Sequence, residues 1–152
     1  MRDIRRPVRV VCVLLTMLRV CYGIDQASSD TLHYFLNLKE ERGNIFYQAK
    51  LDNVDYRVLL KGAIAKDEKS LNALFRYTAE GNLMGEGAET HGAILQALLY
   101  VYGDKTYAKV LSRLSHSIRN QAIAYLDERF GLECYWKQFP RTYALASHER
   151  SS

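Results

Sequence analysis

Four titratable side chains between residues 80 and 91 are of the types that acid–base chemistry uses: Glu80, Glu86, Glu89 and His91. Carboxylates and an imidazole can hold a metal ion or transfer protons. Glu89 and His91 are two residues apart, however, which places them on different faces of a helix. Acidic residues at a helix start also stabilise it through the helix dipole. We therefore expect all four to serve as binding residues, with no catalytic residue and no metal ligand among them.

Motifs for other kinds of chemistry are missing from the sequence. The glycines at 81, 85 and 87 do not form a GxGxxG pattern, and there is no Walker loop. The histidines lack metal-ligand spacing, and Cys134 has only Lys137 nearby to activate it as a nucleophile. We therefore expect no cofactor, and we favour a protein that is not an enzyme.

Residues 1–23 have the build of a secretory signal peptide. Four arginines between residues 2 and 9 precede an apolar run from Val10 to Leu18, and Cys21, Tyr22 and Gly23 follow. The run is shorter than the roughly 20 apolar residues that cross a bilayer. We expect cleavage after Gly23, no membrane insertion after it, and a periplasmic or secreted mature chain.

Cleavage would change the charge of the protein. The whole chain has a net charge of +4, and residues 1–23 carry five arginines and one aspartate, which also gives +4. The mature chain would then have 16 basic and 16 acidic residues. Because the basic pI comes from the signal peptide, the sequence does not indicate nucleic-acid binding. Residues 77–104 contain four acidic residues and no Lys or Arg, so a partner with a basic surface fits this segment.

The segment from residue 87 to residue 115 predicts the central helices. Apolar residues from Ile94 to Tyr102 cover more than one face of a helix, which indicates burial on several sides. Gly103 is placed to end this helix and Asp104 to cap the next one. The next helix has a single apolar stripe that runs from Tyr107 to Leu114. These features predict a helical hairpin.

The segment 45–60 fits two patterns. Period-two alternation around Asp52 and Asn53 is compatible with a short β-hairpin near 45–58. A period of 3.6 runs from Tyr56 to Ile64 and predicts a helix at 55–65. We favour the helix for 55–65 and leave strand and helix open for 45–51.

The remaining segments also predict helices. Asp67 is placed to cap one helix, and Ser115 or Ser117 to cap another. The glycine-rich segment Gly81–Gly87 predicts a loop between helices. Tyr135 and Trp136 lie in an aromatic stretch that is too apolar for a free tail, so we expect this stretch to pack on the helices or to form a binding patch.

These patterns predict an all-α fold, with one compact domain at 24–146 and a disordered tail at 147–152. We expect about five to six helices, arranged as stacked helical hairpins. About 129 residues would remain after cleavage, which is enough for one hydrophobic core.

Three functions compete on this basis. The first is an exported binding or inhibitory protein of the bacterial cell envelope, such as an adaptor or an immunity protein that blocks a toxin through protein–protein contact. The second is a small exported hydrolase that uses Glu86 or Glu89 with His91. The third is a structural subunit that forms a homodimer through Tyr135 and Trp136 or through Cys134, whose role the sequence leaves open. We favour the first, because no catalytic motif stands out.

Overall fold

A computed structural model describes residues 27–127 and 137–145. These residues are helical, and no strand occurs among them, so the predicted all-α class is confirmed. A first helix covers residues 27–36. The helices that follow are α2 (Ile45–Leu51), α3 (Tyr56–Ile64), α4 (Glu68–Glu80), α5 (Gly85–Leu111), α6 (His116–Asp127) and α8 (Pro140–Ala144).

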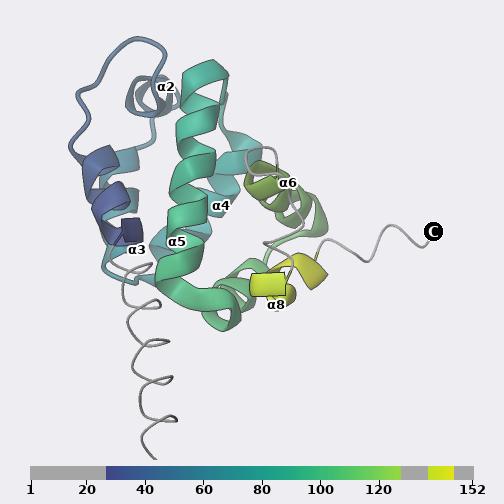
Figure 1. The fold of residues 1–152 in the computed structure, drawn as a ribbon. Coiled ribbons are helices and arrows are strands. Elements are labelled where there is room, and N and C mark those ends of the chain that lie inside the picture. The colour runs from purple at the N-terminus through teal and green to yellow at the C-terminus, as the bar shows by residue number, and fades with distance from the viewer. Residues whose placement is uncertain (1–26, 128–136, 146–152) are drawn as a thin grey trace, which may run out of the picture.

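Helix α5 runs through the middle of the fold, as Figure 1 shows. Helix α4 lies against it, α3 packs on α4, and α6 packs on both α4 and α5. Helix α2 contacts the first turns of α5, and α8 lies near its bend. The short helices α2 and α8 thus pack at the start and at the bend of α5, and the longer helices α4 and α6 also pack against it.

The central helix is buried on several sides, as its sequence predicts. Ile94, Leu95, Leu98 and Leu99 are fully enclosed in the core. Gly103 has φ 70° and ψ 157°, a left-handed conformation that glycine adopts at low cost. The chain therefore bends at Gly103, between the two predicted helices, although the helical segment as a whole continues to Leu111.

Asp104 has a different role from the predicted one. Its carboxylate accepts hydrogen bonds from the backbone N–H groups of Arg141 and Thr142 at 2.9 and 2.8 Å, and from the Thr142 hydroxyl at 2.8 Å. Asp104 therefore caps the start of α8, 37 residues later in the chain. This cap satisfies N–H groups that a short helix cannot satisfy itself.

The β-hairpin alternative for 45–58 is wrong, because residues 45–51 form α2. The Asn44 side chain caps this helix by accepting the Tyr47 N–H at 3.1 Å. Ile45, Phe46 and Ala49 are buried, which is helical rather than period-two spacing. The Asp52–Asn53 turn, with Asn53 at φ 58°, joins two helices instead of two strands.

The caps of the neighbouring helices agree with prediction in part. The Asp67 carboxylate accepts the N–H groups of Lys69 and Ser70, and so caps α4. Ser115 precedes α6, and its hydroxyl lies 3.5 Å from the Ile118 nitrogen. The predicted loop at 81–87 is shorter than expected, since α5 already begins at Gly85.

The C-terminal aromatics that the structure describes pack on the helices. Phe139 and Tyr143 are buried, and the Phe139 ring lies edge-on to Tyr100 with ring centroids 5.0 Å apart. Pro140 begins α8, where a proline needs no N–H partner. Tyr135, Trp136, Cys134, the expected signal peptide and the tail at 147–152 lie outside the described residues. Among the described helices, none has both the length and the apolar character that crossing a membrane requires.

Candidate interaction surface

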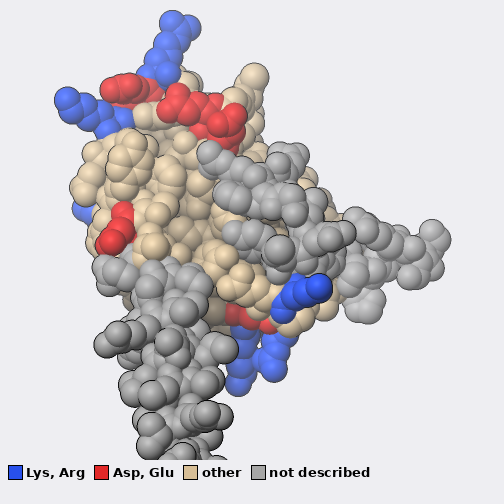
Figure 2. All heavy atoms as spheres, in the orientation of Figure 1, with Lys and Arg blue, Asp and Glu red and all other residues tan. Residues whose placement is uncertain are grey.

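The three predicted carboxylates lie exposed around the connection from α4 to α5. Glu80 ends α4 and lies 3.7 Å from Arg76, an exposed ion pair of small energetic effect. Glu86 is in the first turn of α5, and Glu89 is one turn later. In Figure 2, acidic side chains gather at the end of the molecule where α5 begins, with basic side chains at the margin. The structure therefore places the three carboxylates at the surface.

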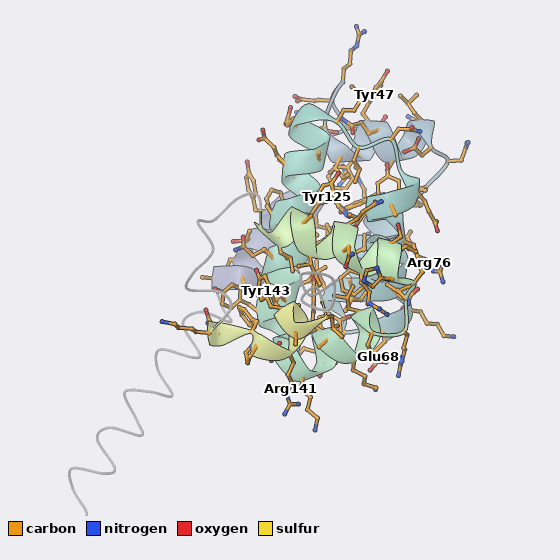
Figure 3. The ribbon with its side chains drawn as sticks, turned by 90° about the vertical axis from the view of Figure 1, so that its right-hand side faces the viewer. Tyr47, Glu68, Arg76, Tyr125, Arg141 and Tyr143 are labelled. Atoms are coloured by element: carbon orange, nitrogen blue, oxygen red, sulfur yellow. The ribbon has the colours of Figure 1, made fainter. Side chains whose placement is uncertain are left out.

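His91 is not on this surface, contrary to prediction, because its side chain is fully buried. Its Nδ1 lies 2.6 Å from the Tyr56 hydroxyl, and its Nε2 lies 2.9 Å from the Thr78 hydroxyl. Three tyrosine rings surround the imidazole edge-on, at centroid distances of 5.7 Å (Tyr56), 5.9 Å (Tyr77) and 5.7 Å (Tyr125). Figure 3 shows Tyr125 on α6. The imidazole is part of the core.

The hydrogen bonds of Thr78 indicate which nitrogen of His91 carries the proton. The Thr78 hydroxyl lies 3.3 Å from the carbonyl oxygen of Leu74, to which it can donate. It can then accept a hydrogen bond from Nε2–H, while Tyr56 donates to Nδ1. Burial lowers the pKa of His91 from 6.5 to about 3, so the neutral ring satisfies the whole network.

The hydrolase alternative needs Glu86 or Glu89 to share a site with His91. The two carboxylates are exposed, whereas both nitrogens of His91 are bound to core residues. The structure therefore does not bring this constellation together.

The loop between α4 and α5 is held by the side chain of Gln48 from α2. Gln48 Oε1 accepts the Met84 N–H at 3.0 Å, and Gln48 Nε2 donates to the Met84 carbonyl at 2.8 Å. The side-chain amide thus bonds to both the N–H and the C=O of one residue, as the backbone of a neighbouring strand would do. The backbone conformation at Met84 is thus fixed by a side chain of another helix, α2.

Gly87 allows this side chain to come close. A Cβ atom at position 87 would lie 2.5 Å from the Gln48 amide group, closer than two such atoms can approach. The glycine-rich segment predicts a loop, but its sequence does not indicate that Gln48 packs against Gly87. Gln48 is 36 residues from Met84, and no local pattern links residues that far apart.

Asp52, at the end of α2, holds the other end of the loop. Its carboxylate accepts hydrogen bonds from the Asn82 side chain at 2.7 Å, the Asn82 N–H at 3.0 Å and the Tyr77 hydroxyl at 2.7 Å. These bonds lower the pKa of Asp52, so the carboxylate stays ionised at neutral pH. We call Gln48 and Asp52 the loop clamp.

The clamped loop presents an apolar side chain to solvent. Met84 is 73% exposed, the most exposed of the large hydrophobic residues that the structure describes. Glu86 follows two residues later and Glu89 three residues after that. The surface therefore combines a flexible, adaptable apolar tip with nearby negative charge on a fixed backbone.

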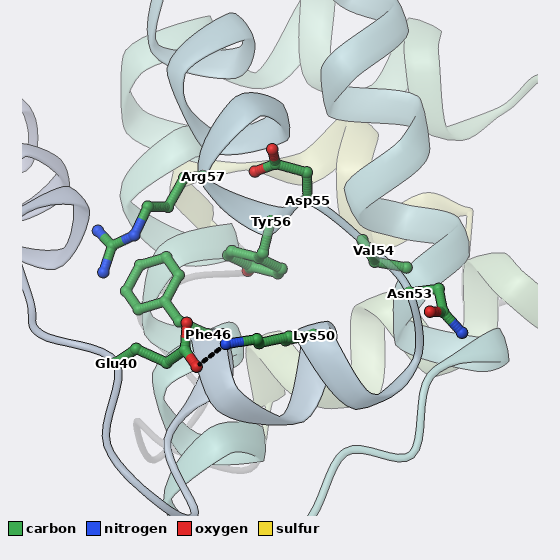
Figure 4. A pocket seen from close by; sticks show the side chains of 8 residues that line it. All are labelled: Glu40, Phe46, Lys50, Asn53, Val54, Asp55, Tyr56 and Arg57. Carbon is green, nitrogen blue, oxygen red and sulfur yellow. Dashed lines mark hydrogen bonds and ion pairs between the residues drawn. The ribbon is translucent and has the colours of Figure 1, made fainter.

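A hollow of about 420 Å³ lies on another side of α2, and Figure 4 shows its lining. Its Lys50 ammonium lies 2.8 Å from a Glu40 carboxylate oxygen. Its Arg57 guanidinium lies 3.9 Å from the centre of the Phe46 ring and donates to the carbonyls of Leu36 and Leu38. These carbonyls are at the end of the helix at 27–36, so Arg57 joins that helix to α3. The cations of this hollow already have partners within the protein.

Comparisons with known proteins give no further guide to function. The chain matches no protein-family model, no curated protein and no solved structure. Within residues 27–127 and 137–145, no three His, Cys, Asp or Glu side chains gather where a metal ion could bind. The functional argument must therefore be made from the side chains of this chain alone.

Proposed function

We propose that this protein acts by binding another protein, through the clamped loop at Gly81–Met84 and the first turns of α5. The observation that carries the proposal is that Gln48 and Asp52 fix a surface loop whose tip, Met84, is 73% exposed. A loop that is fixed before binding loses less conformational entropy when a partner docks.

The chemistry of the surface suggests the kind of partner. Exposed Glu86 and Glu89 beside Met84 would suit a partner with basic residues around an apolar pocket. A protein that binds such a partner would act as an inhibitory protein or an adaptor of the bacterial cell envelope. The signal-like residues 1–23 agree with this location. We also propose that the helices are arranged as stacked helical hairpins. Helices α3 and α4 would form one hairpin, and the two halves of α5 would form the other.

The test is an affinity pull-down with the full chain from envelope and secreted fractions of the native cells. Glu86→Lys combined with Glu89→Lys should abolish recovery of the partner, because like charges would then face its basic surface. Met84→Ser should weaken recovery by removing the apolar contact. Neither change should lower the melting temperature by more than a few degrees, since the side chains are exposed.

Glu41→Lys is the control. Glu41 is an exposed carboxylate before α2, and none of the ion pairs among the described residues includes it. Its reversal therefore changes the charge of the surface without breaking an ion pair. Equal recovery of the partner by the wild type and the Glu86/Glu89 variant would refute the proposal, as would equal loss with Glu41→Lys.

A self-associating subunit predicts a different outcome. The mass of the native protein would then rise with concentration, and reduction would lower it only if Cys134 carries the contact. Analytical ultracentrifugation with and without reductant separates this alternative from binding to another protein.

A further inference from the structure

A second hollow, of about 540 Å³, lies at the start of α4, the end remote from the clamped loop. It lies between the α3–α4 turn and the end of α5. Its lining residues are Lys66, Asp67, Glu68, Lys69, Asn72 and Arg113. Figure 3 places Glu68 toward the lower end of the molecule, where Arg141 also lies.

Both carboxylates of this hollow are occupied by groups of the protein. Asp67 accepts the Ser70 hydroxyl at 2.6 Å and two backbone N–H groups of α4. Glu68 binds Lys109 at 3.0 Å and Arg113 at 2.8 Å. These hydrogen bonds lower the pKa of both carboxyl groups, so their charges are committed to internal contacts at neutral pH.

The positive charges exceed the negative ones. The lining holds the three cations of Lys66, Lys69 and Arg113 against the two carboxylates of Asp67 and Glu68, an excess of one. The Lys109 ammonium is not part of the lining and pairs with Glu68. Within the described residues, neither Lys66 nor Lys69 forms an ion pair.

Asn72 adds a neutral donor to the hollow. Its side-chain oxygen accepts the Arg76 Nε–H at 3.2 Å, which leaves the amide NH₂ as a donor. The hollow therefore offers ammonium, guanidinium and amide donors, while its acceptors are already in use.

We propose that this hollow binds a phosphate group through Lys66, Lys69 and Arg113. The phosphodiester of a lipid headgroup carries one negative charge, and a free phosphate carries roughly one and a half to two near neutral pH, so either is attracted by a lining with an excess of cations. Its oxygens accept several charge-assisted hydrogen bonds at once, and guanidinium groups suit them particularly well. The phosphate can belong to a free anion or to an anionic lipid headgroup. This site is separate from the clamped loop and does not depend on the function proposed for that loop.

Lys66 can be replaced to test the phosphate site without destabilising the fold. It has φ 62°, a left-handed conformation that disfavours lysine and suits glycine. Lys66→Gly therefore removes a cation from the hollow while keeping or increasing stability. Lys39→Gly combined with Lys105→Glu makes the same change of charge at two exposed lysines that do not line this hollow, and is the matched control for the double variant Lys66→Gly/Lys69→Glu.

The experiment is a calorimetric titration of the full chain with inorganic phosphate at low ionic strength. We expect Lys66→Gly combined with Lys69→Glu to weaken binding at least about tenfold, and Lys39→Gly combined with Lys105→Glu to leave it unchanged. A second arm measures cosedimentation with vesicles of phosphatidylglycerol and of phosphatidylcholine.

The two arms distinguish the sources of the phosphate. Binding of inorganic phosphate that the double variant loses identifies a site for the free anion. Binding only to phosphatidylglycerol vesicles, lost in the same variant, identifies a lipid headgroup as the ligand. The proposal is overturned if the wild type binds neither probe, or if Lys66→Gly/Lys69→Glu binds as well as the control.

Discussion

At the scale of single residues, His91 is the group whose chemistry depends most on folding. In the folded protein it is enclosed by tyrosine rings and hydrogen-bonded by Tyr56 and Thr78, and burial lowers its pKa to about 3. In the unfolded chain its pKa returns to about 6.5. At pH values between these two pKa values, the unfolded chain therefore binds a proton at His91 and the folded protein does not. Stability must fall as the pH falls through this window.

We predict that the free energy of unfolding drops by roughly 1.4 kcal/mol per pH unit as the pH falls from about 6.5 to about 4.5. Denaturant titrations at several pH values measure this slope. Asp52, Asp67 and Glu68 have lowered pKa values in the folded protein, so their contribution to the slope appears chiefly near and below the lower end of this window, where they take up protons in the unfolded chain. In His91→Gln the slope should disappear in the upper part of the window. A flat profile in the wild type, or the same slope in the variant, would contradict the burial of a neutral imidazole.

At the scale of elements, apolar periodicity was enough to predict the helices that bury a face. The stripes in α3 and α4 and the broad apolar surface of α5 follow the 3.6-residue period, and Asp67 marks the start of α4. Helix α2 was left open because seven residues are too few to separate the two periods. A helix this short gains its stability from the packing of Ile45, Phe46 and Ala49 rather than from its own propensity.

Only those residues of the candidate site could be predicted whose position follows from being polar and exposed. Glu86 and Glu89 are exposed, as a polar helix start suggests. His91 was misplaced, because its burial follows from packing against tyrosines of three other helices. The contacts of Gln48 with Met84 and of Asp104 with Thr142 join residues more than 30 positions apart. Only the assembled fold reveals them.

Asp104 allows a test of how α8 is held against the rest of the fold. Asp104→Ala removes three hydrogen bonds at the start of α8 and leaves the buried Thr142 hydroxyl without that acceptor. We expect a loss of about 1–3 kcal/mol in the free energy of unfolding. We also expect faster amide exchange at Thr142 than in the wild type. Lys105→Ala, at the exposed neighbour, should change neither quantity; unchanged exchange in Asp104→Ala would show that α8 docks without this cap.

At the scale of the whole molecule, two surfaces with different charge lie at opposite ends of α4. The end next to α2 presents Met84 with Glu86 and Glu89, and the end next to the α3–α4 turn has an excess of cations around Lys66 and Lys69. Helices α4 and α5 connect the two ends through a continuous core. The two proposed sites, one for a basic protein partner and one for a phosphate group, are thus separate, and substitutions at one end should leave the other unaffected.

On the proposed function, Gln48 holds the α4–α5 loop in the conformation that binds the partner before any partner arrives. Amide hydrogen exchange at Asn82 and Met84, followed by NMR, measures whether the loop is held in this way. In the wild type we expect both amides to be protected, because their N–H groups donate to Asp52 and Gln48.

Gln48→Ala should accelerate exchange at Met84 at least about tenfold, with a smaller effect at Asn82, whose acceptor remains. Gln121→Ala, an exposed glutamine of α6, is the control and should change neither rate. If both amides in the wild type exchange as fast as in an unstructured peptide, the loop is not clamped and the proposed binding surface loses its physical basis.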